Sequence, residues 1–210
     1  MTSRPRRSRS RTPRASLDDR LLAAMERLLE NGQGFSAITV EELAREAGIS
    51  RATFYLHFRD RGELVAHLMG RLTEDVVGSA GDWFAARGQS GPQTVKQALR
   101  GIVTTFHKHH AIVSAVAAMA GQDETVAGLH EDMMRQLCER SRRALAAVKA
   151  DSPPGGVSWD SVADVLTWCV EQYCVRFAGQ CDPAQLDALI DTFAHICNSA
   201  IFSPDQSRAR

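Results

Sequence analysis

The sequence lacks the features that would place it in a membrane or outside the cell. No apolar run approaches the roughly 18 residues that a membrane-spanning helix needs, and the N-terminus carries no apolar segment of a secretory signal. The five cysteines are odd in number and irregularly spaced, with no CxxC pair and no histidine at zinc-ligand spacing. We therefore expect a cytoplasmic protein with reduced thiols, no bound metal, no cofactor and no membrane contact.

Signatures of common enzyme classes are also missing. The sequence has no nucleophile elbow, no HExxH, no phosphate-binding loop and no close pair of carboxylates in an apolar setting. We predict no catalytic residues. An enzyme stays an alternative that loss of an activity in cysteine or histidine variants would support.

Charge is balanced overall but unevenly distributed. The 210 residues carry a formal net charge of zero, yet residues 1–16 hold six arginines and no acid, which leaves 19 basic against 25 acidic side chains elsewhere. A segment of arginine, serine and proline with almost no apolar residue cannot offset its ordering entropy. We expect a disordered basic arm over residues 1–16 that orders on a polyanion, and a solvated tail without a role is the alternative.

Helical patterns cover the remaining sequence, which shows no strand-like alternation and no internal repeat. Capping signals and Gly, Pro and Asp clusters divide it into segments. We predict an all-α fold of about nine helices, over residues 17–30, 39–47, 51–57, 60–87, 93–110, 111–120, 123–150, 158–179 and 183–202.

Residues 39–58 have the spacing of a helix-turn-helix unit. Thr39 and Glu42 form a capping box, and Gly48 lies where a positive φ is needed. Phe54 and Phe58 are four residues apart and are expected in the core of a small three-helix domain. The unit predicts DNA binding, and a packing unit that binds no nucleic acid is the alternative.

The other residues of the second helix of this unit suit a major groove. Arginine can pair with guanine, alanine and leucine can meet a thymine methyl, and hydroxyl or imidazole groups can hold phosphate. Removing the core positions leaves six residues for its outer face and flanks: Arg51, Ala52, Thr53, Tyr55, Leu56 and His57.

The stretch TVEELAREAGISRATFYLHFRDRGEL, residues 39–64, resembles the DNA-binding signature of the TetR family of transcriptional repressors. The resemblance implies base contacts by Arg51, Ala52, Thr53 and Leu56, and contacts to the DNA backbone by Thr39, Tyr55, His57 and Arg61. Arg61 stands where family members often carry a phosphate-contacting lysine. Gly62 follows it, and glycine there weakens the first helical turn by up to roughly 1 kcal/mol relative to alanine.

The resemblance also implies a division into a DNA-binding domain, residues 17–66, and a ligand-binding and dimerisation domain, residues 67–210. Residues 183–202 carry a wide apolar stripe, and residues 158–179 are apolar on more than one side, which requires burial on two faces. Helix-turn-helix dimers bind two half-sites about 34–36 Å apart or at a related spacing. We therefore predict a homodimer through these two C-terminal helices.

The central helices contain many large apolar residues, for which an ordinary core is the alternative to a ligand site. The resemblance implies that they surround a cavity, and small-molecule sites are mostly apolar with few polar groups. Methionines adapt to irregular ligands. Our candidate ligand-binding residues are Ile102, Phe106, Met119, Met133 and Trp168.

His107, His109 and His110 flank Lys108 in a run that could be mistaken for a metal site. No carboxylate lies at the matching turn, and the run falls at a predicted helix end. We expect a solvated, partly charged helix C-terminus, where cations suit the helix dipole.

Together these features predict a ligand-responsive repressor that binds an inverted-repeat operator as a dimer and is released by a small, mostly apolar effector. Activation rather than repression stays open. The alternative is an architectural DNA-binding protein that responds to no ligand.

Overall fold

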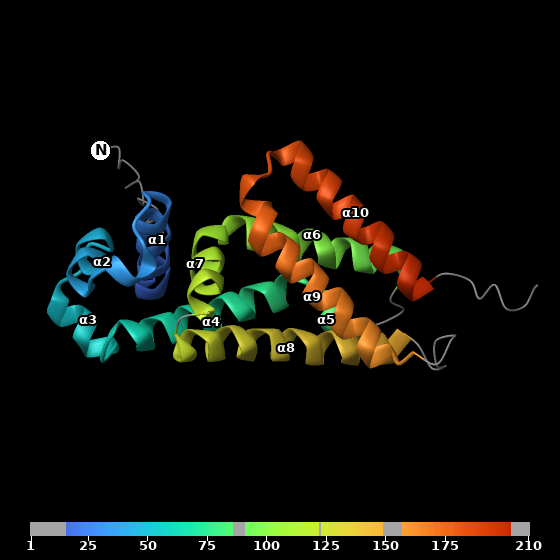
Figure 1. Cartoon of the computed structure of the whole chain (residues 1–210), viewed down its shortest axis with the longest axis horizontal. Helices are drawn as coiled ribbons and strands as arrows, with labels where there is room; N and C mark the ends of the chain where they lie inside the picture. The colour runs from blue at the N-terminus through green and yellow to red at the C-terminus, as the bar shows by residue number, and fades with distance from the viewer. Residues whose placement is uncertain (1–15, 86–90, 122, 149–156, 203–210) are drawn as a thin grey trace, which may run out of the picture.

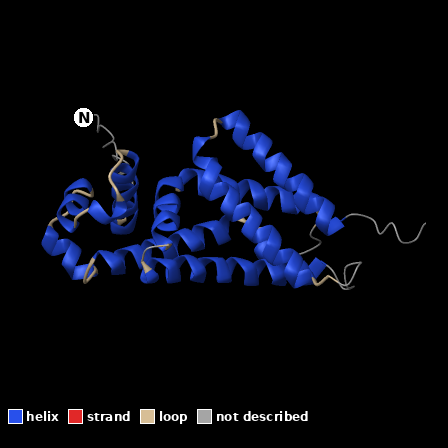
Figure 2. Cartoon of the chain, in the orientation of Figure 1, coloured by secondary structure: helices blue, strands red, loops and turns tan. Residues whose placement is uncertain are grey.

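The computed structural model describes residues 16–85, 91–121, 123–148 and 157–202. The predicted basic arm lies outside the described residues, apart from Ser16. Within the described ranges the chain forms ten α-helices and two short 3-10 segments and contains no strand (Figures 1 and 2). The prediction of an all-α fold is confirmed.

The first helices are α1 (Leu17–Glu30), η1 (Phe35–Ala37), α2 (Val40–Glu46) and α3 (Arg51–His57), which together are called the head below. The remaining elements, called the body, are α4 (Arg61–Ser79), α5 (Asp82–Ala85), α6 (Pro92–Lys108), α7 (His110–Ala120), α8 (Glu124–Val148), α9 (Trp159–Phe177), η3 (Ala178–Gln180) and α10 (Pro183–Phe202).

One predicted helix is wrong as a single element. The pattern over residues 60–87 forms α4, which ends at Ser79, and the separate short helix α5. Gly81 adopts a φ of 55° between them, a left-handed conformation that ends the α-helical path. This break explains why the described chain has ten helices rather than nine. The predicted helix ends at residues 87 and 150 lie outside the described residues.

The head is held together as the sequence predicts. Phe54 is fully buried and Phe58 is 7% exposed, and both belong to the core cluster that includes Leu21 and Met25. Gly48 has a φ of 65°, which permits the tight turn between α2 and α3. These contacts fix the position of α3 within the head.

The helix α4 runs from the head into the body (Figure 1). Its 19 residues span about 28 Å at 1.5 Å per residue. In the central part of α4, Arg71 Nη1 lies 3.0 Å from Asp19 Oδ1 and His67 Nε2 lies 3.0 Å from Asp18 Oδ2 of α1. At its far end, Val76 is fully buried in the body.

In the body, α8 packs along α9, α10 packs on α6, and α7 contacts both α8 and α1. Among the described residues, no helix is long and apolar enough to cross a bilayer.

Candidate DNA-binding face and ligand cavity

The outer face of α3 is built by a short, well-capped helix. Ser50 Oγ accepts a hydrogen bond from the Thr53 backbone amide at 2.9 Å, which starts the helix at Arg51. Because Phe54 anchors the inner face, Leu56 is left 82% exposed and Tyr55 49% exposed. A leucine this exposed contributes little packing within the described chain, and its contact with a base stays a prediction.

The polar residues of α3 are available to a duplex. Arg51 Nη1 lies 3.6 Å from Glu41 Oε2, and both side chains are largely exposed. Exposed pairs of this kind contribute little and exchange readily. Ala52 and His57 are exposed, and Thr53 is half-buried. Five of the six residues named for this face are therefore solvent-exposed on one short helix.

Thr39 is committed to capping α2. Its hydroxyl donates to Glu42 Oε2 at 2.8 Å and accepts from the Glu42 amide at 3.2 Å, while the Thr39 amide donates to the same carboxylate at 2.9 Å. These hydrogen bonds hold the pKa of Glu42 below its usual value, the backbone contact most strongly. A phosphate oxygen only accepts hydrogen bonds, so a phosphate contact by Thr39 would require its hydroxyl proton to turn away from Glu42.

Arg61 anchors the head to the start of α4. Its Nη1 donates to the carbonyl oxygens of Phe35, Ser36 and Ile38 at 3.0, 2.8 and 2.8 Å. Its guanidinium carbon also lies 5.5 Å from the centre of the Phe35 ring. The phosphate contact stays a prediction, and it would fall to the Nε and Nη2 atoms.

The expectation of a solvated histidine run is wrong for His109. His109 is 2% exposed and its Nδ1 lies 2.5 Å from Glu26 Oε1 on α1, a residue 83 positions away in sequence. His107 and His110 are half-buried, and His107 Nδ1 lies 2.7 Å from the Ala178 carbonyl oxygen. The run packs at a junction of helices because α7 contacts α1 and both α6 and α7 contact η3. No group of three or more potential metal ligands exists in the described part of the chain.

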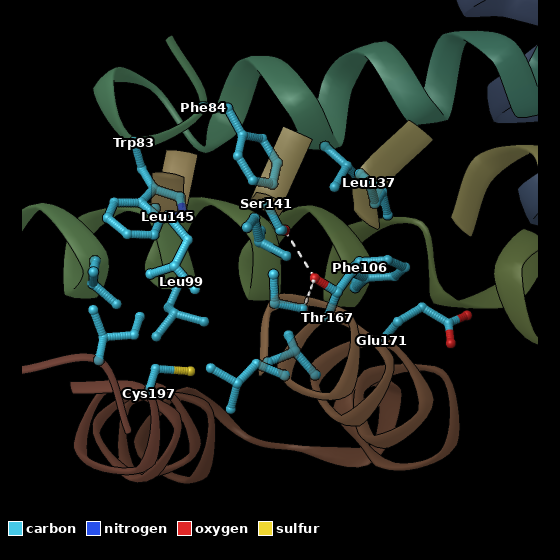
Figure 3. Close-up of a pocket in the computed structure, with 18 residues that line it drawn as sticks. Trp83, Phe84, Leu99, Phe106, Leu137, Ser141, Leu145, Thr167, Glu171 and Cys197 are labelled. Atoms are coloured by element: carbon cyan, nitrogen blue, oxygen red, sulfur yellow. Dashed lines mark hydrogen bonds between the residues drawn. The ribbon is translucent and has the colours of Figure 1, made fainter. Parts of the chain in front are cut away.

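A cavity of about 80 Å³ lies inside the body (Figure 3). Its walls come from α4, α5, α6, α8, α9 and α10, and most lining side chains are apolar. Of the candidate ligand-binding residues, Ile102 and Phe106 line this cavity.

The structure does not bring the other three candidates to this cavity. Met133 is 1% exposed within the core, and Trp168 is 41% exposed on the outer side of α9. Met119 lines a separate, open groove between the end of α1 and α7. Helical periodicity identifies apolar positions, but not which of them border an empty space.

The polar residues of the cavity were missed from sequence. Ser141, Thr167 and Glu171 line it. Glu171 is 1% exposed, and its carboxylate accepts from His130 Nε2 at 2.9 Å and from Gln172 Nε2 at 2.8 Å. The hydrogen bond to Glu171 raises the pKa of His130, against the opposing effect of burial. The sequence signal that could have identified these three residues is a polar residue on an otherwise apolar helix face.

An uncovered face runs along α9 and α10. On α9, Val165 is 60% exposed, Tyr173 45% and Phe177 42%, and on α10 Ile196 is 48% exposed. These side chains leave the single chain with apolar surface on the two helices predicted to form a dimer. Large exposed apolar patches on a folded protein mark an interaction site.

Comparisons with known proteins agree with this arrangement. Residues 21–68 match the model for bacterial regulatory proteins of the tetR family, and residues 95–203 match the C-terminal domain of transcriptional regulator EthR. The chain is 27% identical over 206 residues to the HTH-type transcriptional regulator EthR of Mycobacterium tuberculosis, covering 93% of each protein. It is 35% identical over 108 residues to EthR of Mycolicibacterium smegmatis, over 50% of this chain and 46% of the relative.

Solved structures of similar fold include a TetR-family transcriptional regulator from Rhodococcus sp., with a TM-score of 0.70, 15% identity and coverage of 88% of this chain and 97% of that one. A TetR-family regulator from Syntrophomonas wolfei has a TM-score of 0.72 at 12% identity, over 90% and 97% of the two chains. At these identities the likeness concerns the fold.

Proposed function

The chain belongs to the TetR family of transcriptional regulators, whose members are regulators rather than enzymes, and from that premise we propose that it is a ligand-responsive repressor. In this proposal it binds an inverted-repeat operator as a homodimer in the cytoplasm. Residues 17–66 form the DNA-binding domain and residues 67–210 the domain that binds the effector and the second subunit. The observation that carries the proposal is the outward face of α3, where Leu56 is 82% exposed beside the fully buried Phe54.

The eight predicted DNA-contacting residues divide by position. Arg51, Ala52 and Leu56 project from α3 toward base edges, whereas Tyr55 and His57 lie on its flank for phosphate contacts. Thr53 is half-buried and reaches bases at the start of the helix. Thr39 at the start of α2 and Arg61 at the start of α4 complete the contacts to the DNA backbone.

Ligand in the cavity would act on the head through α4. Val76 of α4 lines the cavity, while Arg71, His67 and Arg61 of the same helix contact α1 or η1 of the head. Because α4 is one continuous helix, a shift at the cavity is passed on to its contacts with the head. In a dimer, such a shift changes the distance between the two α3 helices and so the fit to two half-sites.

The dimer is proposed to form through α9 and α10. Their outer faces carry the exposed apolar residues described above, and Ala188, Thr192 and Ser199 on α10 are small and exposed, which permits close approach of a second helix pair. Four helices, two from each subunit, would then cover Val165 and Ile196.

The direct test is selection of bound fragments from a random duplex library, followed by affinity measurements at several salt concentrations. The proposal predicts enrichment of an inverted repeat that binds at least about 10³-fold more tightly than a scrambled control. Equal affinity for both duplexes would contradict it and favour the architectural DNA-binding alternative.

Release by an effector has its own test. A coupling free energy of about 1–3 kcal/mol would lower operator affinity roughly 5–150-fold, and operator must weaken effector binding by the same factor. Identical effector affinity with and without operator DNA would rule out this mechanism. The cavity bounded by five longer helices favours the ligand-responsive alternative over a filled architectural core.

A further inference from the structure

A second hollow lies where the head meets the body. The helix α1 of the head runs beside α7 of the body (Figure 1), and an open groove of about 620 Å³ is bordered by the end of α1, η1 and α7. It shares no lining residue with the cavity inside the body. The polar side chains that line it are Glu30, Gln33, Ser36, His110 and Ser114.

Glu30 brings an uncompensated negative charge to this groove. It is exposed and forms no ion pair within the described ranges, and none of the described residues that line the groove is a lysine or arginine. Glu30 is also the last residue of α1, where the helix dipole already places partial negative charge. A cation bound beside Glu30 would compensate both.

Gln33 adds a hydrogen-bond acceptor without a donor. Its Oε1 atom is buried and has no hydrogen-bond partner among the described residues. Buried polar atoms are nearly always paired, because an unpaired one loses its hydration without compensation. A donor that enters the groove at Gln33 would remove this cost.

Ser114 and His110 also present acceptors to the groove. Ser114 Oγ donates its proton to the Val175 carbonyl oxygen at 3.1 Å, so its lone pairs are what it has left. His110 Nδ1 lies 3.1 Å from the His107 carbonyl oxygen, which has no proton to give, so Nδ1 is the donor and Nε2 of the neutral ring keeps its lone pair. The Ser36 hydroxyl can donate or accept.

We infer that the groove between α1 and α7 binds an organic cation, in which an ammonium group lies beside Glu30 and Gln33 and a small apolar part lies along Leu29 and Met119. An ammonium group has three donors and no acceptor, which complements this set of acceptors. Leu29 and Met119 belong to the lining. The bound cation would contact the head and the body at once, and this site does not depend on the proposed effector cavity.

The test compares three probes of matched size with the purified full-length chain: naphthylmethylammonium, naphthylmethanol and naphthoate, all substituted at the same ring position. They share the apolar part and differ in carrying a cation, a neutral hydroxyl or an anion. Isothermal titration at millimolar probe concentrations should give the ammonium probe an affinity about 3–10-fold above that of the alcohol, as expected for a charge-assisted hydrogen bond near the surface. Naphthoate should bind more weakly than either.

A charge variant identifies the carboxylate. Glu30→Gln keeps the size of the exposed side chain but removes its charge, and it should reduce the affinity for the ammonium probe to that for the alcohol. Glu74→Gln is the matched control, because Glu74 is an exposed glutamate on α4 that does not line the groove. The control should preserve the preference for the cation.

A bulky variant locates the site. Ala118 is exposed on α7 and lines the groove, so Ala118→Trp should fill it and abolish binding of the ammonium probe. Ala146→Trp is the matched control, since Ala146 is exposed on α8 and does not line the groove. Thermal unfolding shows that each variant is folded before it is titrated.

Four outcomes overturn the inference: no binding of the ammonium probe, equal affinity for the ammonium and alcohol probes, a preference for the cation that survives in Glu30→Gln, or unchanged binding in Ala118→Trp. The titrations use neither operator DNA nor an effector of the cavity. Their failure is therefore distinguishable from a failure of operator selection or of effector release.

Discussion

Glu26 and His109 form a largely buried pair that joins the head to the body. Glu26 Oε1 on α1 lies 2.5 Å from His109 Nδ1 at the junction of α6 and α7, and the His109 side chain is 3% exposed. Together with the contacts between α4 and α1, this pair gives the head a second attachment. Any rotation of α1 against α7 must strain or break it.

Glu26→Ala should therefore destabilise the protein. It leaves the buried His109 imidazole without its hydrogen-bond partner, and we expect the free energy of unfolding to fall by about 2 kcal/mol. Glu30→Ala, one turn later and exposed on the same helix, is the control and should change stability by less than about 0.5 kcal/mol. Urea unfolding of the variants measures both, and equal losses would show that the pair has no special value.

The three carbonyl contacts of Arg61 predict a mainly structural effect of its removal. Arg61→Ala leaves the carbonyl groups of Phe35, Ser36 and Ile38 without this donor. We expect the free energy of unfolding to fall by about 1–3 kcal/mol. A phosphate contact through Nε or Nη2 would in addition lower the slope of log affinity against log salt by up to about 0.9. Unchanged stability with a lowered slope would assign Arg61 to DNA alone.

The pair of His130 and Glu171 predicts a pH dependence of stability. Glu171 raises the pKa of His130 in the folded state. The contribution of this pair to the free energy of unfolding is therefore full below the ordinary histidine pKa of about 6.5. It is lost as pH rises through the raised pKa of His130 in the folded state. We expect the difference in unfolding free energy between the wild-type chain and His130→Gln to shrink across that range.

Thr104→Ala, an exposed change on α6 that involves no titratable group, is the control for this titration. Its difference from the wild-type chain should stay level with pH. Denaturant unfolding at several pH values provides the measurement, and a level difference for His130→Gln would contradict the proposed pairing.

Much of the head could be predicted from the sequence because its signals are local. Ser50 caps α3 and Phe58 follows its last residue, so the predicted boundaries at residues 51 and 57 are those of the structure. Capping boxes act within four residues, and the inner and outer faces of a short helix follow from one aromatic pair. The break at Gly81 was missed because the apolar pattern continues on both sides of it.

The cavity and the buried histidine depend on partners far away in the chain. His109 is buried beside Glu26 of α1, which lies 83 positions away in sequence, and no local pattern near residue 109 contains that information. Likewise, Met133 and Ile102 are equally apolar in sequence, but only the packing of α6 against its neighbours leaves Ile102 beside an empty volume.

The outer face of α3 predicts that binding to the selected operator can be weakened without weakening binding to scrambled DNA. Arg51→Ala removes a side chain that can pair with guanine, and we expect a loss of about 1–3 kcal/mol for the selected operator with little change for scrambled DNA. Arg143→Ala removes an arginine from the exposed surface of α8, far from the head in sequence, and serves as the control. Fluorescence anisotropy with both duplexes measures the effect. Equal losses on both duplexes would indicate a phosphate contact instead.

The exposed apolar face of α9 predicts that a single charged substitution on this face prevents dimer formation. Val165 is 60% exposed in the single chain and lies among exposed apolar residues, so Val165→Asp would place an unpaired carboxylate in the subunit interface. We expect this variant to sediment as a monomer and to lose most of its operator affinity, because each subunit then binds one half-site alone. Val157→Asp is the matched control, since Val157 is 50% exposed just before α9 and outside the helix. A dimeric Val165→Asp protein in analytical ultracentrifugation would place the interface on another surface.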